Sequence, residues 1–255
     1  MKFFKYQATG NDFIIIDNFN KEINLSSNQI KTICDRRFGI GADGLIFLEK
    51  KDGFDYSMIY YNSDGKISTF CGNGSRCLAH FAHKKNIFNI KAHFFANNNN
   101  YYAHIHENLI SIKMPNISNL RVIDDNSIFV DSGSPHLVLF KENVKKLDVV
   151  NLGREIRYSK MYTQNGVNVN FVEKNNKCLY VRTYERGVED ETLSCGSGVV
   201  ASVIASHKIG NIESGETYVK TNGGDIKVSF NYELNLYKDI YLSSDVSLVF
   251  CGELQ

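Results

Sequence analysis

Cys71-Gly72-Asn73-Gly74 recurs further along the chain as Cys195-Gly196-Ser197-Gly198, and this repeat determines the expected fold. The offset between the two cysteines is 195 − 71 = 124 positions. Each cysteine is also followed by a His-Lys pair, His83-Lys84 in the first copy and His207-Lys208 in the second. Repetition over such a long interval indicates duplicated units rather than unrelated glycine turns. We therefore expect two similar halves that meet at a cleft.

A second pair of segments is repeated with nearly the same spacing. Gly10-Asn11-Asp12-Phe13 and Gly133-Ser134-Pro135-His136 both precede apolar runs, at an offset of 133 − 10 = 123 positions. Strand-like runs dominate the chain and helical patterns are few. The predicted fold class is α+β, with two pseudo-symmetric halves, each a sheet wrapped around a central helix, and an active site in the cleft between them. The expected domains are residues 1–115, which contain Cys71, and residues 116–245, which contain Cys195.

Four segments carry helical patterns. One begins at Ser26 or Ser27, residues that are natural N-caps. Two others directly follow Cys71 and Cys195, and a weaker one covers residues 148–156. The two central helices therefore begin at the repeated cysteines.

The positions of Cys71 and Cys195 favour acid–base chemistry. Unpaired amides and the helix dipole stabilise negative charge at a helix N-terminus, which lowers the pKa of a thiol from its ordinary value of about 8.5. The glycines let backbone amides face an anion such as a substrate carboxylate. Two such sulfurs facing one cleft fit stereochemical inversion, in which one takes a proton from a carbon and the other returns one to the opposite face. The other four cysteines, Cys34, Cys77, Cys178 and Cys251, are interpreted as small buried hydrophobic residues.

Composition excludes several function classes. The chain carries 29 basic and 28 acidic side chains, so it lacks the basic excess of a nucleic-acid-binding protein. No apolar run is long enough to cross a bilayer, and the charged start at Lys2 and Lys5 does not resemble a signal peptide. We expect a cytoplasmic protein that acts on a small molecule, without nucleic-acid or membrane partners. A homodimer is an alternative that the sequence leaves open.

At the motif level the chain resembles the diaminopimelate epimerases nearly from end to end. The residues that carry the resemblance are Lys5-Tyr6, Thr9–Phe13, Arg37–Gly44, Asn62–Gly65, Cys71–Cys77, Ser134–His136, Gly166–Asn168, Tyr184–Gly187, Glu191-Thr192 and Cys195–Gly198. Two positions depart from the family pattern, Ser134 in place of Asn and Gly44 in place of the Gln of some members.

The resemblance implies epimerisation of LL-2,6-diaminopimelate to the meso form, in lysine and peptidoglycan precursor synthesis, without a cofactor or a metal. It implies that Cys71 and Cys195 are the catalytic acid and base, that His136 and Glu185 tune their pKa values, and that a C-terminal strand within residues 246–255 completes the first half. Substrate contacts are implied at Asn11, Asn62, Gly72, Asn73, Asn168, Glu185, Arg186, Gly196 and Ser197.

Alternative interpretations remain at three levels. The enzyme could be a proline racemase-like or other amino-acid racemase of the same fold, or Cys71 and Cys195 could form a non-catalytic redox or metal-binding thiol pair. Arg186 and Glu185 could be a surface ion pair beside the acidic run 189–191. Gly39–Gly44 fits the dinucleotide pattern GxGxxG, but we expect it to follow a helix and precede a strand, the reverse of that fingerprint.

Overall fold

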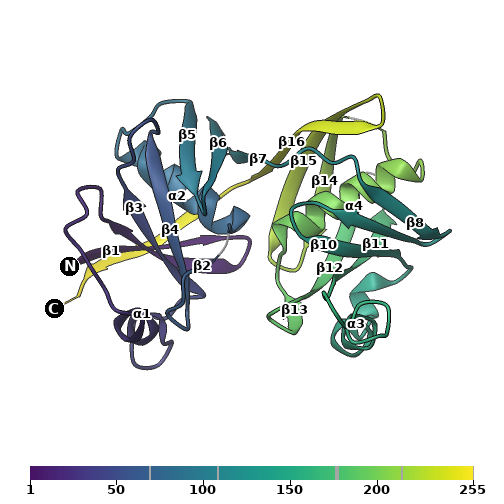
Figure 1. The fold of residues 1–255 in the computed structure, drawn as a ribbon, viewed down its shortest axis with the longest axis horizontal. Helices are drawn as coiled ribbons and strands as arrows, with labels where there is room; N and C mark the ends of the chain where they lie inside the picture. Colours follow the sequence, from purple (N-terminus) through teal and green to yellow (C-terminus); the bar gives the residue numbers. More distant parts are fainter. Residues whose placement is uncertain (69, 108, 176–177, 214, 255) are drawn as a thin grey trace. The chain divides into compact units, whose positions relative to one another are not determined.

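The chain forms two compact units that repeat the same order of elements. The computed structural model describes residues 1–68, 70–107, 109–175, 178–213 and 215–254. The first unit comprises Met1–Ile112 and Ser244–Gln255, and the second comprises Lys113–Ser243. Their central helices, α2 (Gly72–Lys84) and α4 (Gly196–Lys208), have 13 residues each and begin directly after the repeated cysteines. The prediction of two similar α+β halves is confirmed (Figure 1).

The sheet of the first unit is built from eight strands. Strand β1 pairs antiparallel with both β17 and β2, β2 runs parallel to β3, and β3 pairs antiparallel with β4. Strand β4 runs parallel to β5, and β5, β6 and β7 follow as antiparallel neighbours. The strands are β1 (Lys2–Ala8), β2 (Asn11–Asp17), β3 (Gly44–Glu49), β4 (Tyr56–Asn62), β5 (Lys91–Ala96), β6 (Asn99–His106), β7 (Leu109–Lys113) and β17 (Ser247–Glu253).

The second unit reproduces this pattern of directions. Strand β9 pairs antiparallel with β8 and β10, β10 runs parallel to β11, and β11 pairs antiparallel with β12. Strand β12 runs parallel to β14, with β15 and β16 as antiparallel neighbours and the short β13 beside β12. The strands are β8 (Leu120–Asp124), β9 (Ser127–Asp131), β10 (Pro135–Phe140), β11 (Asn168–Asn175), β12 (Cys178–Glu185), β13 (Asp190–Thr192), β14 (Gly215–Thr221), β15 (Gly224–Glu233) and β16 (Leu236–Ser244). The C-terminal strand β17 therefore occupies in the first unit the place that β8 occupies in the second; Gln255 lies outside the described residues.

The central helices are the most buried elements of their units. Every residue of α4 from Gly198 to Ser206 is buried, as are most residues of α2. A helix that is apolar on all sides is stable only when it is surrounded by protein, and each helix contacts strands from several parts of its own sheet (Figure 1). These contacts hold the first turn of each central helix in place within its own sheet.

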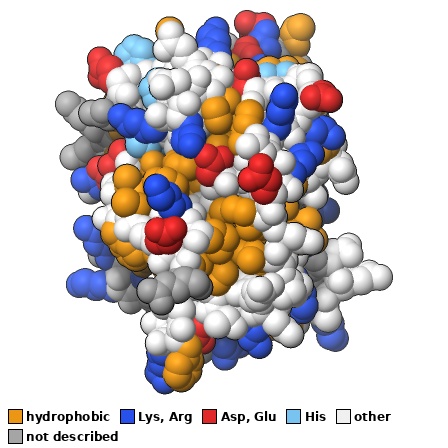
Figure 2. Space-filling model, turned by 90° about the vertical axis from the view of Figure 1, so that its left-hand side faces the viewer, with side chains coloured by type: hydrophobic (Ala, Val, Ile, Leu, Met, Phe, Trp, Pro, Cys, Tyr) orange, Lys and Arg blue, Asp and Glu red, His pale blue; other side chains and the backbone are white. Residues whose placement is uncertain are grey.

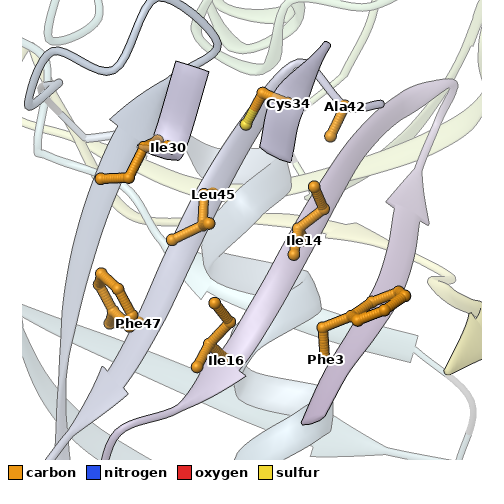
Figure 3. Packing of buried hydrophobic residues seen from close by; sticks show 8 residues of the cluster. All are labelled: Phe3, Ile14, Ile16, Ile30, Cys34, Ala42, Leu45 and Phe47. Atoms are coloured by element: carbon orange, nitrogen blue, oxygen red, sulfur yellow. The ribbon is translucent and has the colours of Figure 1, made fainter. Parts of the chain in front are cut away.

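The remaining helices cover the outer face of each sheet. Helix α1 (Ser27–Cys34) begins with a capping box between Ser26 and Gln29, as the N-cap prediction required. Its residues Ile30 and Cys34 pack on β2 and β3 (Figure 3). Helix α3 (Val149–Arg157), capped by Asp148, follows the short helix η1 (Val144–Lys146) in the second unit. All four predicted helices are confirmed.

Gly39–Gly44 lies between α1 and β3, so the prediction that it is not a dinucleotide fingerprint is confirmed. No helix within the described ranges is long and apolar enough to span a bilayer.

The four cysteines outside the repeat behave differently from one another. Cys34 and Cys77 are buried, and burial raises the pKa of Cys34 to about 11, as expected for inert thiols. Cys178 is half-buried, and Cys251 is exposed on β17, so the prediction of burial is wrong for Cys251. Hydrophobic side chains gather on the face in Figure 2, and on β17 the neighbours Leu248, Val249 and Phe250 are also largely exposed. Both faces of β17 are exposed over this stretch, because every residue from Ser247 to Cys251 is exposed and successive side chains of a strand point to opposite faces.

Ile14→Ala tests the packing beneath α1. Ile14 is fully buried in the cluster of Figure 3, so we expect the free energy of unfolding to fall by about 2–5 kcal/mol. Urea denaturation measures the change. The matched control is Ile90→Ala, whose side chain is 61% exposed and which should change stability by no more than about 0.5 kcal/mol. Equal effects of the two substitutions would contradict this account of the core.

Candidate active site

Cys71 is the N-cap residue of α2. Its backbone is extended, with φ −124° and ψ 114°, and its Sγ accepts a hydrogen bond of 3.5 Å from the amide of Gly74. The carbonyl of Cys71 accepts from the amide and hydroxyl of Ser75, which closes the first turn. The sulfur therefore lies at the positive end of the helix dipole, where negative charge is stabilised.

Gly74 lets this helix start approach the sheet. A Cβ added at Gly74 would lie 2.9 Å from Cδ1 of Ile46 and 3.2 Å from Cε of Met58. Any larger residue would push the first turn of α2 away from β3 and β4. The glycine of the motif therefore sets the position of Cys71 as well as exposing backbone amides.

Asn11 is the side chain that meets the Cys71 sulfur. Its Oδ1 lies 3.7 Å from Cys71 Sγ and accepts a hydrogen bond of 3.2 Å from Nδ2 of Asn73. Its Nδ2 donates to the carboxylate of Asp43 at 2.5 Å, which fixes the orientation of the amide. The Asn11 oxygen that faces the sulfur can therefore only accept a hydrogen bond, which the thiol form of Cys71 can donate.

A cluster of charges holds Asn11 and Asp43 in place. Arg36 donates to both Asp12 and Asp43, and Lys5 pairs with Asp12 at 2.7 Å. Burial raises the pKa of Asp12, but the hydrogen bonds and charges of Arg36 and Lys5 outweigh it and hold that pKa well below its usual range. Asp12 is therefore ionised at neutral pH and is held between two cations.

Asn62 lies at the same end of the sheet. It is the last residue of β4 and pairs with Gly44, which in turn pairs with Phe13 of β2, two residues after Asn11. Gly44 has no room for a side chain, because a Cβ there would lie 2.4 Å from the carbonyl of Tyr61. The first unit therefore brings together Cys71, Asn11 and Asn73, with exposed Asn62 at the neighbouring strand end.

Cys195 repeats the geometry of Cys71 on α4. Its backbone angles are φ −117° and ψ 109°, and it is 9% exposed. Its Sγ lies 3.5 Å from Oγ of Ser197, the second residue of α4. The neighbour of the second sulfur is therefore a hydroxyl, which can donate as well as accept.

A buried polar chain ends at Ser197. The hydroxyl of Thr183 donates to Oδ1 of Asn170, and Nδ2 of Asn170 donates to Nδ1 of His136 at 3.0 Å. Burial lowers the pKa of His136 to about 3, assisted by the charge of Arg186, so the ring is neutral and carries its proton on Nε2. That nitrogen lies 2.9 Å from Ser197 Oγ and donates to it. The Ser197 proton is thereby available to the Cys195 sulfur.

Gly198 makes this chain possible. A Cβ at position 198 would lie 2.3 Å from Oδ1 of Asn170 and 3.3 Å from the ring of His136. Only glycine lets the helix lie directly on the polar chain. The two glycines at equivalent positions, Gly74 and Gly198, therefore serve different contacts, one apolar and one polar.

Asn168 has a positioning role in the second unit. It is 4% exposed, and its Nδ2 donates to Oγ of Ser134 and to the carbonyl of Pro135, while its Oδ1 accepts from the amide of Arg186. Ser134, one of the departures from the family pattern, is thus a partner of Asn168. Both polar atoms of the Asn168 side chain are therefore engaged within the protein, and its oxygen positions the backbone of Arg186.

Arg186 and Glu185 lie at the end of β12, both half-buried. The NH1 group of Arg186 donates to the carbonyl of Asn165 at 2.8 Å. The neighbouring acidic residues pair with other arginines, Glu189 with Arg157 and Glu191 with Arg182. Two of the three residues of the acidic run therefore pair with arginines other than Arg186.

Several residues of the site were not expected from the sequence. Asn170 and Thr183 belong to the chain behind Ser197, Asp43 orients Asn11, and Arg76 donates to Oδ1 of Asn73. Asn170 and Arg76 carried a signal, because each is a polar residue at a position of an apolar strand or helix pattern that faces the core.

Comparison with known proteins identifies the family. The profile of the family described as Diaminopimelate epimerase matches residues 3–106 and 128–239. The chain belongs to the diaminopimelate epimerase family. A diaminopimelate epimerase from Flavobacterium psychrophilum is 48% identical over 98% of both chains, and one from Chlorobaculum tepidum is 41% identical over 97% of this chain and 98% of its own. Among solved structures, a PhzF-family phenazine biosynthesis protein from Bacillus anthracis shares the fold, with a TM-score of 0.76 at 13% identity, covering 100% of this chain and 99% of its own.

His136→Gln tests the neutral state of the buried histidine in this family member. Between pH 6.5 and about 3 the unfolded chain binds a proton at His136 that the folded chain does not bind. The contribution of His136 to stability is therefore complete above pH 6.5 and is lost as pH falls below it, by about 1.4 kcal/mol per pH unit. We expect the variant to lose less stability than the wild type between pH 7.5 and 5, measured by urea denaturation.

The control for this prediction is His106→Gln, which replaces an exposed histidine and should leave the wild-type pH dependence unchanged. His80 and His207, whose pKa values burial also lowers, are present in both proteins and cancel in the comparison. Parallel curves for wild type and His136→Gln would show that the buried ring is charged.

Proposed function

We propose that the chain epimerises LL-2,6-diaminopimelate to the meso form without a cofactor, with Cys71 and Cys195 as acid and base. The observation that carries the proposal is the repeated cysteine N-cap on two buried helices, in a chain that matches diaminopimelate epimerases over nearly its full length. A single such cysteine would suit many reactions. Two in equivalent settings suit a reaction with equivalent chemistry on two faces of one carbon.

The proposed mechanism is a two-base proton exchange. One cysteine, as the thiolate, removes the α-proton, and the electron pair of the C–H bond remains on carbon and the adjoining carboxylate. The other cysteine, as the thiol, delivers its proton to the opposite face, so the two sulfurs exchange protonation states in each turnover. First-turn amides, including those of Gly72, Asn73, Gly196 and Ser197, are suited to bind the carboxylate as negative charge develops.

The distal end of the substrate needs its own recognition. Diaminopimelate carries a second amino-acid group, and Arg186 is suited to pair with its carboxylate. Glu185 and the amides of Asn11 and Asn62 are suited to its ammonium group. Asn168 would contribute by holding the backbone of Arg186. A substrate without the distal group would not engage these polar residues.

The proposed setting is the cytoplasm, where the reaction supplies lysine and peptidoglycan precursors. The thiol state of the six cysteines is compatible with a reducing compartment. The substrate is a small amino acid, and assembly as a homodimer would cover the exposed apolar residues of β17.

The first test is α-proton exchange of LL-diaminopimelate in deuterated water, followed by NMR. We expect exchange with inversion in the wild type without an added cofactor, and a loss of inversion of at least about 10²–10⁴-fold in Cys71→Ala and in Cys195→Ala. Cys251→Ala is the matched control, because it removes an exposed thiol and should retain activity.

Each other outcome has a distinct meaning. Exchange with proline or another amino acid but not with diaminopimelate would retain the two-base chemistry and change the substrate. Exchange with no amino acid would reject the enzymatic proposal in favour of a thiol pair without catalytic function.

A further inference from the structure

Arg76 is a cation in the core of the first unit. It lies on α2, five residues after Cys71, and its side chain is 0% exposed. It is the largest of the fully buried side chains. An arginine keeps its charge in proteins, and a buried charge is costly unless negative groups or hydrogen bonds compensate it.

Hydrogen bonds compensate Arg76 only in part. One NH2 group donates to Oδ1 of Asn73, whereas Nε and NH1 have no hydrogen-bond partner among the described residues. Burial lowers the pKa of Arg76, and the negative forms of Cys77, Cys71 and Asp245 oppose that effect. The compensation must therefore come largely from nearby negative charge.

Among the described residues, these three ionisable groups act on the charge of Arg76, and two of them are poor counter-charges. Burial raises the pKa of Cys77 strongly, so Cys77 remains a neutral thiol at physiological pH. Asp245 is exposed, and solvent weakens its interaction with a buried group. Cys71, at the start of the same helix, is the remaining candidate for a negative counter-charge to Arg76.

Arg76 is also connected to Cys71 through two amides. Arg76 donates to Asn73 Oδ1, Nδ2 of Asn73 donates to Asn11 Oδ1, and that oxygen lies 3.7 Å from the Cys71 sulfur. The guanidinium thus fixes the orientation of both amides. Because Asn11 presents an oxygen to the sulfur, this contact favours the thiol, whereas the Gly74 amide and the helix dipole favour the thiolate.

The two units differ at this point. The residue equivalent to Arg76, at 76 + 124 = 200, is Val200, which is also fully buried. The second unit instead places the Ser197 hydroxyl 3.5 Å from Cys195, supported by neutral His136. Cys195 thus has a neighbouring hydroxyl donor and a valine at this helix position, whereas Cys71 has a neighbouring acceptor and a buried cation.

We propose that Arg76 is a positioning residue that stabilises the Cys71 thiolate through its buried charge, in place of the hydroxyl that Ser197 offers to Cys195. The inference rests on the proposed function in that Cys71 is taken as a proton-transferring group. Arg76 would act on the reaction without contacting the substrate. The Cys71 thiolate would depend on the charge of Arg76 rather than on its hydrogen bond to Asn73.

The test is the pH dependence of alkylation at each cysteine, measured with iodoacetamide and peptide mass spectrometry in the whole protein without substrate. Arg76→Met removes charge and hydrogen bond, Arg76→Gln removes the charge and keeps a donor, and Arg76→Lys keeps the charge. We expect both neutral variants to react about tenfold or more slowly at Cys71 near pH 7, with the midpoint displaced to higher pH, and Arg76→Lys to resemble the wild type. Alkylation of Cys195 should be unchanged in all three.

Leu78→Met is the packing control, since it alters another fully buried side chain of α2 at nearly constant volume and should leave Cys71 unaffected. Circular dichroism establishes that each variant is folded, and Arg76→Gln carries the test if Arg76→Met does not fold. The proposal is wrong if Arg76→Gln reacts like the wild type at Cys71, or if Cys195 slows equally. Because alkylation requires no substrate, these outcomes do not depend on whether diaminopimelate is epimerised.

Discussion

The start of each central helix inside its sheet is the constraint on which the rest of the structure depends. The first amides of a helix lack partners within the helix, and burying them requires an acceptor that is present at all times. Cys71 and Cys195 occupy the N-cap position with the same extended backbone, and at Cys71 the sulfur itself accepts from the amide of Gly74. Glycines in the first turn then let the sheet approach, so closely at Gly198 that a single methyl group would displace Asn170. The reactive sulfur and the packing of the helix are therefore set by the same few residues.

Duplication preserved the backbone of this arrangement and changed its electrostatics. The first unit surrounds its cysteine with charges, namely Arg76 in the core and the ionised cluster of Lys5, Asp12, Arg36 and Asp43 behind Asn11. The second unit supports its cysteine with neutral groups, because His136 is too deeply buried to bind a proton at physiological pH. Strands, helices and register can be repeated through backbone geometry alone, whereas buried polar side chains must each be satisfied by their own neighbours.

The sequence was sufficient to predict the architecture because its signals are local and repeated. Cysteine followed by Gly-x-Gly marks both helix starts, and Ser26 with Gln29 marks a third. The polar contacts between side chains far apart in the sequence were harder to predict. Asp43 is 32 residues from Asn11, and Asn170 is 34 from His136, so their contacts depend on strand pairing that no local pattern specifies. The exposure of Cys251 was missed as well, since an apolar run such as that of β17 suggests a buried strand, whereas both faces of residues 247–251 are exposed.

The proposed two-base reaction accounts for the use of different neighbouring groups to set the acidity of Cys71 and of Cys195. Each sulfur must be a thiolate in one direction of the reaction and a thiol in the other, so the two acidities have to lie close together. A buried cation and a hydroxyl donor both favour a thiolate. The halves would therefore be expected to diverge in the groups behind each cysteine, where the acidity is set, and to remain alike in the helix starts, where the sulfur is placed.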